Sequence, residues 1–370
     1  MAKFLAKYRE RTTRYTLNLA LKDCENKELE SFFNYAKDNG VERSLIEFAA
    51  RVCYNSTARL GTAPNFIRNV LESGHLSVSE HPSIGFHLGD LFKIGSEDGN
   101  STGNPAVTSP QNIRSRFEKL TAYNRFFVRK NNYAIANIRS WIELLQSAGT
   151  TVQGFEEILT IIPDAFDTTP ALAQHTSEFN AFVNFINVPT YEDESGLKVA
   201  LLAANVDFQK LSNRSGFVGK NSEYGRFTWL IEGVSRSLTH QLVRHRLASV
   251  SQESQRYVDA MKHPAFVYPP GLTEMQRGEL ETFNLHSLET YKKLRDSGVK
   301  KEDARFVLPN GIATRLVFSL DLEALIHFLN LRCAKDAQWE IRRLAFVMGQ
   351  QANLALPNKR VQGILEWTES

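Results

Sequence analysis

The sequence contains few cysteines and no long apolar run. Only Cys24, Cys53 and Cys333 occur among 370 residues, too few and too scattered for a disulfide framework or a cysteine-ligated metal cluster. No stretch approaches the roughly 20 apolar residues that span a bilayer. The N-terminus, MAKFLAKYRERTTRY, is charged throughout and lacks the apolar core of a signal peptide. These absences predict a protein of the reducing cytoplasm that does not bind membranes.

The chain also lacks an excess of charge of one sign. It has 44 basic and 41 acidic residues, a formal net charge of +3, whereas proteins that coat nucleic acid or bind a membrane surface are usually more lopsided. Hydrophobic residues make up 42%, which is ordinary for a globular protein with a sizeable core. A chain of 370 residues is expected to form two or three units.

Several common catalytic motifs are missing as well. No Walker loop, dinucleotide-binding glycine pattern or Ser-His-Asp elbow is visible. The spacing of His75, His81 and His87 is not that of a helix-borne zinc pair, and we predict no metal site. Cys333 follows Arg332 in a predicted helix, where it is expected to pack rather than react.

Short predicted strands alternate with longer predicted helices. Runs rich in aromatic and β-branched residues predict strands over 83–88, 182–188, 227–231 and 315–320. Helices are predicted over 45–54, 64–72, 274–297, 321–332 and 337–356. Thr273 and Gln276 form a capping box at the start of the third helix, and Gly298 follows its last turn. Dominant helices with isolated strands among them indicate an α+β fold.

Residues 235–257, SRSLTHQLVRHRLASVSQESQRY, concentrate groups that suit an anionic ligand. The first part is predicted to be helical, with Gln241 and Arg244 on one face. Arg244, His245 and Arg246 are consecutive, so in a helix their side chains would point about 100° apart. Such a triplet is useful where partners approach from several sides, as at a subunit junction.

Hydroxyls and a further arginine follow this triplet, namely Ser249, Ser251, Ser254 and Arg256. Guanidinium groups and hydroxyls together suit phosphate, because the planar guanidinium donates paired hydrogen bonds and keeps its charge. A solvated basic helix end followed by a serine-rich loop is the alternative explanation.

Two more arginines occur in apolar settings. Arg305 lies in DARFVLP, and Arg332 ends the apolar stripe of the helix predicted over 321–332. A guanidinium in such a place needs a partner, which can be a ligand phosphate or a carboxylate such as Asp336 or Glu340.

The segment GHLSVSEH, residues 74–81, precedes the first predicted strand. Ser77, Glu80 and the two histidines could serve in acid–base or hydrogen-bonding roles. An ordinarily capped turn between a helix and a strand explains the same residues.

Together these segments resemble flavin-dependent thymidylate synthases. The triplet RHR is followed, after seven residues, by Ser254-Gln255-Arg256. The match extends to ARVCY at 50–54, to GHLSVSEH and to EDARFVLPNGIATRLVFSLDLEALIHFLNLRCAKDAQWEIR at 302–342, and it covers about residues 45–88 and 227–350. The resemblance implies the fold of that family, in which helices pack on a central antiparallel sheet.

The resemblance also implies an activity and a site. The family makes dTMP from dUMP, with methylene-tetrahydrofolate as carbon donor, FAD as hydride carrier and NADPH as reductant. The implied dUMP ligands are Gln241, Arg244, Ser254, Arg256, Arg305 and Arg332. The implied FAD ligands are Ser77, Asn137, Arg139, Arg244, His245, Arg246, Gln252 and His327. The implied catalytic residues are Arg332, which resembles the arginine that polarises the uracil ring, and His75, which resembles a histidine near flavin and folate.

Some positions depart from the family pattern. Gln252 stands where a flavin-side glutamate is usual, with the carboxylate displaced to Glu253, and Cys53 stands where serine is common. Asp321 and Glu323 replace an Asn-x-Arg pair. Two acids near the diphosphate of a flavin should repel it.

Residues 89–226 have no counterpart in the usual short member of the family. Within them NNYAIANIRSWIELL, residues 131–145, resembles the family's strand followed by Asn-x-Arg and a helix, with Asn137 and Arg139 at the positions of that pair. We therefore predict two related halves, residues 1–180 with GHLSVSEH and residues 181–370 with RHR. A homodimer of such chains would replace the homotetramer that the resemblance implies. A plain insertion is the alternative.

Other functions stay open at this point. We expect dUMP and folates as partners and no nucleic acid. The same fold could instead serve a flavin-linked dUMP hydroxymethylase or an inactive nucleotide-binding relative, which labelled dUMP would distinguish by its products. A basic RHR helix could also bind RNA or DNA, which predicts a colourless protein with salt-sensitive binding.

Overall fold

The computed structural model has an α+β fold built around one large sheet. It describes residues 15–63, 65–87, 115, 117–118, 127–129, 133–147, 184–207, 211–212 and 224–356. The large sheet has seven strands in the order β10-β11-β9-β7-β1-β5, with β6 paired to β7. They are β1 (Tyr15–Asn18), β5 (Asn184–Ile186), β6 (Tyr191–Glu192), β7 (Lys198–Asp207), β9 (Tyr224–Ser235), β10 (Ser249–Gln252) and β11 (Ala313–Asp321).

The pairing in this sheet is antiparallel except between β1 and β5. The strands predicted over 227–231 and 315–320 are the middle parts of β9 and β11. The predicted central antiparallel sheet is present, because β9 pairs with β7 on one side and with β11 on the other. The partner β7 escaped prediction because KVALLAANVD is rich in alanine and offers few β-branched or aromatic side chains.

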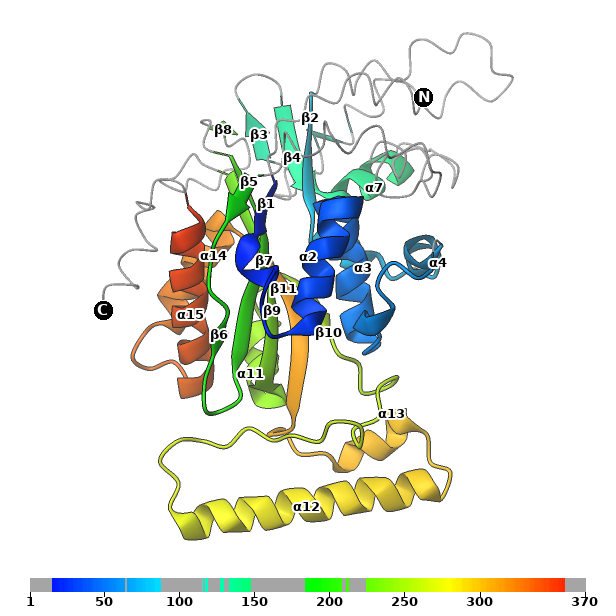
Figure 1. The fold of residues 1–370 in the computed structure, drawn as a ribbon, viewed down its shortest axis with the longest axis vertical. Helices are drawn as coiled ribbons and strands as arrows, with labels where there is room; N and C mark the ends of the chain where they lie inside the picture. Colours follow the sequence, from blue (N-terminus) through cyan, green and yellow to red (C-terminus); the bar gives the residue numbers. More distant parts are fainter. Residues whose placement is uncertain are drawn as a thin grey trace.

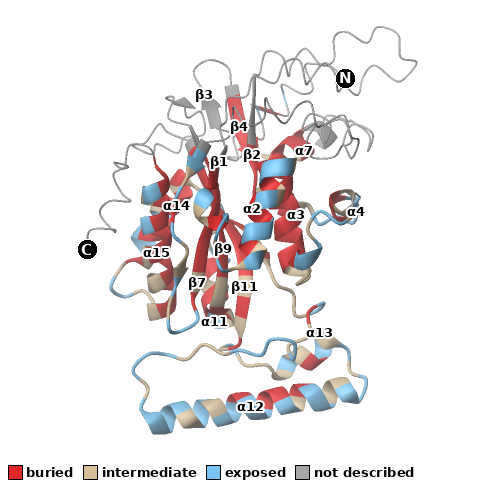
Figure 2. Cartoon of the chain, viewed as in Figure 1, coloured by how far each residue is buried: buried red, intermediate tan, exposed pale blue. Residues whose placement is uncertain are grey.

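Helices cover both faces of the sheet (Figure 1). The first face carries α2 (Lys27–Asn39) and α3 (Val41–Cys53), and the second carries α11 (Arg236–Leu242), α14 (Leu322–Arg332) and α15 (Trp339–Ala355). Successive side chains of a strand point to opposite faces. Leu230 and Val317 accordingly enter the core with α2 and α3, whereas Trp229 and Phe318 enter the core with α14 and α15. Figure 2 shows the resulting buried layers on both sides of the strands.

A second, smaller sheet has the order β2-β4-β3-β8. Its strands are β2 (Ser83–His87), β3 (Phe127–Arg129), β4 (Tyr133–Asn137) and β8 (Leu211–Ser212), and α7 (Ile138–Ser147) follows β4. The strand and helix predicted within 131–145 are confirmed by β4 and α7. The Asn137 side chain accepts a hydrogen bond from the backbone N–H of Ser140 and so caps α7.

The remaining helices connect these parts. They are α4 (Phe66–Glu72), the 3-10 helix η3 (Leu76–Glu80), α12 (Glu274–Asp296) and the short α13 (Lys301–Ala304). The predicted capping box is present, since Thr273 and Gln276 each accept a hydrogen bond from the other's backbone N–H. In Figure 1, α12 lies below the large sheet. None of the helices that the structure describes is long and apolar enough to cross a bilayer.

The RHR triplet does not lie in a helix, and that prediction is wrong. Ser235 caps α11 by accepting from the N–H of Leu238, but the helix ends at Leu242. Arg244, His245 and Arg246 lie in the turn that leads into β10. The chain must reverse here because β10 pairs with β11 from Ser249 opposite Ser319 onward. This pairing is distant in sequence, so it overrides the local helical pattern.

Candidate active site

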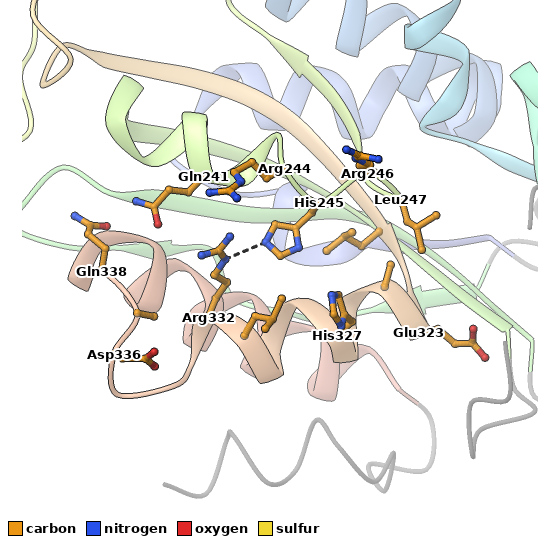
Figure 3. A pocket seen from close by; sticks show the side chains of 14 residues that line it. Gln241, Arg244, His245, Arg246, Leu247, Glu323, His327, Arg332, Asp336 and Gln338 are labelled. Carbon is orange, nitrogen blue, oxygen red and sulfur yellow. Dashed lines mark hydrogen bonds between the residues drawn. The ribbon is translucent and has the colours of Figure 1, made fainter.

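A cavity of about 860 Å³ lies between the turn after α11 and one side of α14 (Figure 3). It is lined by Gln241, Arg244, His245, Arg246, Leu247, Leu320, Glu323, Ala324, His327, Leu331, Arg332, Asp336, Ala337 and Gln338. Figure 3 shows Gln338 and Asp336 at one end of the cavity and Glu323 at the other.

Two capped helices position one wall of this cavity. Asp321 accepts from the N–H of Ala324 at the start of α14, and Gln338 accepts from the first N–H groups of α15. Glu323, His327 and Leu331 follow one another at intervals of four residues in α14, so they lie on the same face of the helix. The wall is therefore a stripe of α14, with the junction to α15 at its end.

His245 and Arg332 meet in the middle of the cavity. The Nε–H of Arg332 donates to Nε2 of His245 over 2.9 Å, as the dashed line in Figure 3 marks. The His245 ring also makes an edge contact with Phe328, with ring centroids 4.9 Å apart. Burial lowers the pKa of His245 to about 4, and the nearby Arg332, His327 and Arg244 add to this shift. His245 is therefore neutral near pH 7 and can accept a hydrogen bond.

Three guanidinium groups face the cavity, from Arg244, Arg246 and Arg332. One of the two carboxylates considered as a partner for Arg332 is engaged elsewhere. Glu340 accepts hydrogen bonds from both the backbone N–H and the hydroxyl of Ser235, each over 2.6 Å. The arrangement gives the cavity a positive region that suits an anionic ligand.

Glu323, at the end of the cavity away from Gln338 and Asp336, is a weaker acid than an ordinary glutamate. Burial and the neighbouring Asp321 raise the pKa of Glu323 to about 7. Asp321 is not among the residues that line the cavity, and its side chain is used as the cap of α14. Of Asp321 and Glu323, only Glu323 faces the cavity, and its raised pKa makes it less negatively charged near pH 7 than an ordinary glutamate.

Six of the predicted site residues line this cavity, namely Gln241, Arg244, His245, Arg246, His327 and Arg332. They come from segments that are distant in sequence. Their amide, guanidinium and imidazole groups are of the kinds that bind an anionic ligand. The family model for thymidylate synthase complementing protein matches residues 37–91 and 217–358, which is more than half of the chain. The chain belongs to this family.

Individual relatives match a smaller part of this family member. The flavin-dependent thymidylate synthase of Geobacter sulfurreducens is 47% identical over 129 residues, which is 34% of this chain and 56% of the relative. The enzyme of that name from Nitratidesulfovibrio vulgaris is 45% identical over 136 residues, or 34% of this chain and 55% of the relative. The chain thus spans little more than half the length of these curated relatives.

A solved structure of the same kind matches only loosely. The crystal structure of thymidylate synthase X from Helicobacter pylori with FAD and dUMP is 24% identical. The match covers 40% of this chain and 74% of that chain, with a TM-score of 0.32.

The family match is interrupted between residues 91 and 217. The intervening part of this family member is built into both sheets. It supplies β7, which lies between β1 and β9 in the large sheet, and it supplies β3, β4 and β8, which are the strands that extend the small sheet from β2.

A second group of predicted residues lies away from the cavity, around α13. The Nε–H of Arg305 donates to the carbonyl of Glu302 over 3.0 Å, and Arg256 Nε lies 3.3 Å from the Glu302 carboxylate. The backbone N–H of Ser254 donates to the carbonyl of Cys53. The structure does not bring these three dUMP candidates to Gln241, Arg244 and Arg332 within one chain.

Gln252 also points away from the cavity. Its amide NH₂ lies 3.2 Å from the Thr239 hydroxyl and 3.3 Å from the Thr314 hydroxyl, to which it can donate. The Thr239 hydroxyl already donates to the carbonyl of Arg236, so it can only accept from residue 252, which an ionised glutamate could not satisfy. The departure from the family pattern therefore has a structural explanation, because the amide of Gln252 connects β10 to α11 and β11.

The third group of predicted residues lies around η3 and α7. His75 and Ser77 are exposed. Arg139 forms ion pairs with Glu80 at the end of η3 and with Glu143 one turn further along α7. None of these residues lines the cavity.

Two polar cavity residues are missing from the predicted site, namely Glu323 and Gln338. The sequence marks Glu323 only as a departure from the family pattern, and it does not single out Gln338. Gln338 lies before the first turn of α15, so it belongs to no helical stripe, although the block 302–342 includes it. Its role as a helix cap was the one available signal.

Neither cysteine chemistry nor a metal cluster is indicated in the described part of the chain. Burial raises the pKa of the Cys53 thiol to about 11 and that of Cys333 also to about 11, so both are thiols at neutral pH. Among the described residues, no group of three or more His, Cys, Asp or Glu side chains is arranged to hold a metal ion.

Proposed function

We propose that this chain is a flavin-dependent thymidylate synthase that converts dUMP to dTMP. Membership of the family and the names of the relatives at 47% and 45% identity support the proposal. One observation carries it: Gln241 near the end of α11, Arg244 in the turn after it and Arg332 at the end of α14 converge on one cavity. Residue types that suit a phosphorylated pyrimidine are thereby collected from two distant segments.

The nucleotide would bind to the amide of Gln241 and to the guanidinium groups of Arg244 and Arg332. A phosphate binds well to the paired donors of arginine, which suits Arg244 with Gln241 beside it. Arg332 would face the pyrimidine, where its fixed positive charge stabilises the negative charge that develops on the ring. The reaction then depends on position and electrostatics and needs no cysteine nucleophile.

The residues around the cavity fit a flavin. Arg244, His245, Arg246 and His327 would hold it, with the guanidinium groups near its diphosphate. Glu323 opposes this anion less than an ordinary carboxylate, since its pKa is raised to about 7. FAD supplies the hydride when bound. The resemblance adds methylene-tetrahydrofolate as carbon donor and NADPH as reductant.

A second chain would complete the site. Ser254, Arg256 and Arg305 form a separate group around α13, and we propose that they reach the nucleotide of a neighbouring subunit. The Arg256–Glu302 ion pair is weak because both side chains are more than one-third exposed, so a phosphate can replace the carboxylate. Exposed His75, which precedes η3, and exposed Ser77 within it would meet flavin and folate in the same way.

We also propose that the chain consists of two related halves, residues 1–180 and 181–370. The unit β2–β4–α7 has the same local construction as β9–β11–α14. In the first, Ser83 pairs with Asn137, which caps the following helix, and in the second Arg226 pairs with Asp321, which caps its helix. Asn137 and Arg139 would then be the flavin ligands of the first half. A homodimer would result, which light scattering of the full chain can test.

The proposed activity can be tested with the purified full-length protein. The expected results are a flavin absorbance spectrum and the conversion of ring-labelled dUMP to dTMP in the presence of methylene-tetrahydrofolate and NADPH. A colourless protein that binds nucleic acid in a salt-sensitive way would contradict the proposal, and a hydroxymethylated product would change the reaction assigned to the site.

A further inference from the structure

We propose that His245 is a positioning residue for Arg332: by accepting the Nε–H of Arg332 it holds the guanidinium in one orientation toward the nucleotide. The two side chains are 2.9 Å apart at Nε and Nε2. The bond uses Nε, so the Nη atoms remain the donors with which Arg332 can meet a ligand. The identity of this ligand rests on the proposed function, whereas the bond itself does not.

The bond determines the tautomer of His245. The guanidinium of arginine is always a donor and never an acceptor. Nε2 must therefore be without a hydrogen, and in the neutral ring the proton is on Nδ1. Burial and the three surrounding cationic or imidazole groups keep the ring neutral near pH 7.

The ring of His245 is held firmly enough to orient a longer side chain. Its edge contact is with Phe328, a fully buried residue of α14. Its backbone N–H donates to the carbonyl of Leu242 at the end of α11. Arg332 is the last residue of α14 and has the more flexible side chain, so the histidine is the fixed member of the pair.

A neutral acceptor suits this position better than a carboxylate. A carboxylate would orient Arg332 but would also cancel much of its positive charge. The imidazole supplies an acceptor without a negative charge, so the full charge of Arg332 remains for the pyrimidine. Glu340, a carboxylate considered as a partner for Arg332, accepts hydrogen bonds from Ser235 instead.

Matched substitutions test the positioning role. His245→Gln keeps an acceptor near the place of Nε2, whereas His245→Leu has a similar size and no acceptor. We expect His245→Leu to weaken dUMP binding about tenfold and His245→Gln less than about threefold, as for a hydrogen bond to a charged group. Binding is measured by calorimetry on the full-length protein, with flavin content determined separately. Equal losses in the two variants would overturn the proposal.

A double-mutant cycle separates positioning from direct contact. If His245 acts through Arg332, then His245→Leu should cause almost no further loss of dUMP affinity in an Arg332→Gln background. If the losses in the two single variants add up in the double variant, His245 acts on the ligand independently and the proposal is wrong.

The bond can also be observed without any ligand. In ¹⁵N spectra of histidine-labelled protein near pH 7, we expect His245 to have a bare Nε2 and a protonated Nδ1, with the Nε2 signal shifted by Arg332→Gln. The His245→Gln protein identifies the signal by its loss. A protonated Nε2 would refute the positioning role. If His245 has the expected tautomer but the protein does not bind dUMP, the bond to Arg332 stands and the proposed function is refuted.

Discussion

The imidazole of His81 joins two strands of the large sheet, with Nε2 2.8 Å from the Ser251 hydroxyl of β10 and Nδ1 2.8 Å from the Ser319 hydroxyl of β11. The side chain is buried, at 1% exposure. Arg226 of β9 reinforces the attachment by donating to the backbone carbonyls of Glu80 and His81. GHLSVSEH is thus fixed to the sheet by its last residue, which leaves His75 and Ser77 exposed at its other end.

The burial of His81 predicts a loss of stability in acid. Burial, with a smaller contribution from Arg226, lowers the pKa of His81 from 6.5 to about 3. Between these values the unfolded chain binds a proton that the folded chain excludes, so the free energy of unfolding falls as the pH drops below about 6.5. The contribution is at most about 1.4 kcal/mol per pH unit. Urea unfolding between about pH 7 and pH 4 measures it.

The matched control for this prediction is His81→Asn. This variant should be less stable at neutral pH by about 1–3 kcal/mol, because a hydroxyl loses its buried partner. Its stability should also depend less steeply on pH. An unchanged pH dependence would show that His81 is not the group responsible.

Arg332→Ala should abolish thymidylate formation while flavin stays bound. Removing a group that stabilises developing charge typically costs 10²–10³ in rate, or about 2.7–4 kcal/mol. Single-turnover rates and the flavin spectrum of the variant test this. Near-normal turnover would remove Arg332 from the site.

Glu323 should make flavin binding weaker at alkaline pH. Its pKa is raised to about 7, so the carboxyl becomes charged as the pH rises through neutrality and then repels the diphosphate. We expect the dissociation constant of FAD to rise a few-fold between about pH 6 and pH 8.5, at a scale of about 1 kcal/mol. In Glu323→Gln this rise should disappear. Fluorescence titration at constant ionic strength gives both curves.

Arg256→Ala and Arg332→Ala should complement each other if two chains share each site. Each variant alone should be inactive. Arg256→Ala removes a proposed ligand from the group around α13, and Arg332→Ala removes one from the cavity. Co-expressed chains should recover part of the activity, since some oligomers contain a site with both arginines intact. Failure to recover activity in mixed oligomers of proven composition would argue that the α13 group does not serve the site.

Local sequence signals predicted those elements that depend on local interactions. The capping box at Thr273 and Gln276 placed the start of α12, and the apolar stripe placed α14. The turn that holds RHR was not predictable, because no glycine or proline lies in residues 236–253 to end the helix. The pairing of β10 with β11 ends it, and a single sequence does not contain that information.

The sequence predicted which residues bind ligands, but not which of them lie together in the fold. Arg244, His245 and Arg332 were expected to bind ligands, and they do line one cavity. Arg256 and Arg305 were expected beside them and lie around α13 instead, because local spacing does not determine which distant segments a fold brings together. The bond between His245 and Arg332 joins residues 87 positions apart, which local spacing does not reveal.

The position of β7 between β1 and β9 makes the intervening segment indispensable to the fold. Its removal would expose the long edge of β9 and leave β1 without its antiparallel partner. An exposed edge of that length is a site for aggregation. A shortened chain without this segment is therefore expected to fold only if another strand takes the place of β7.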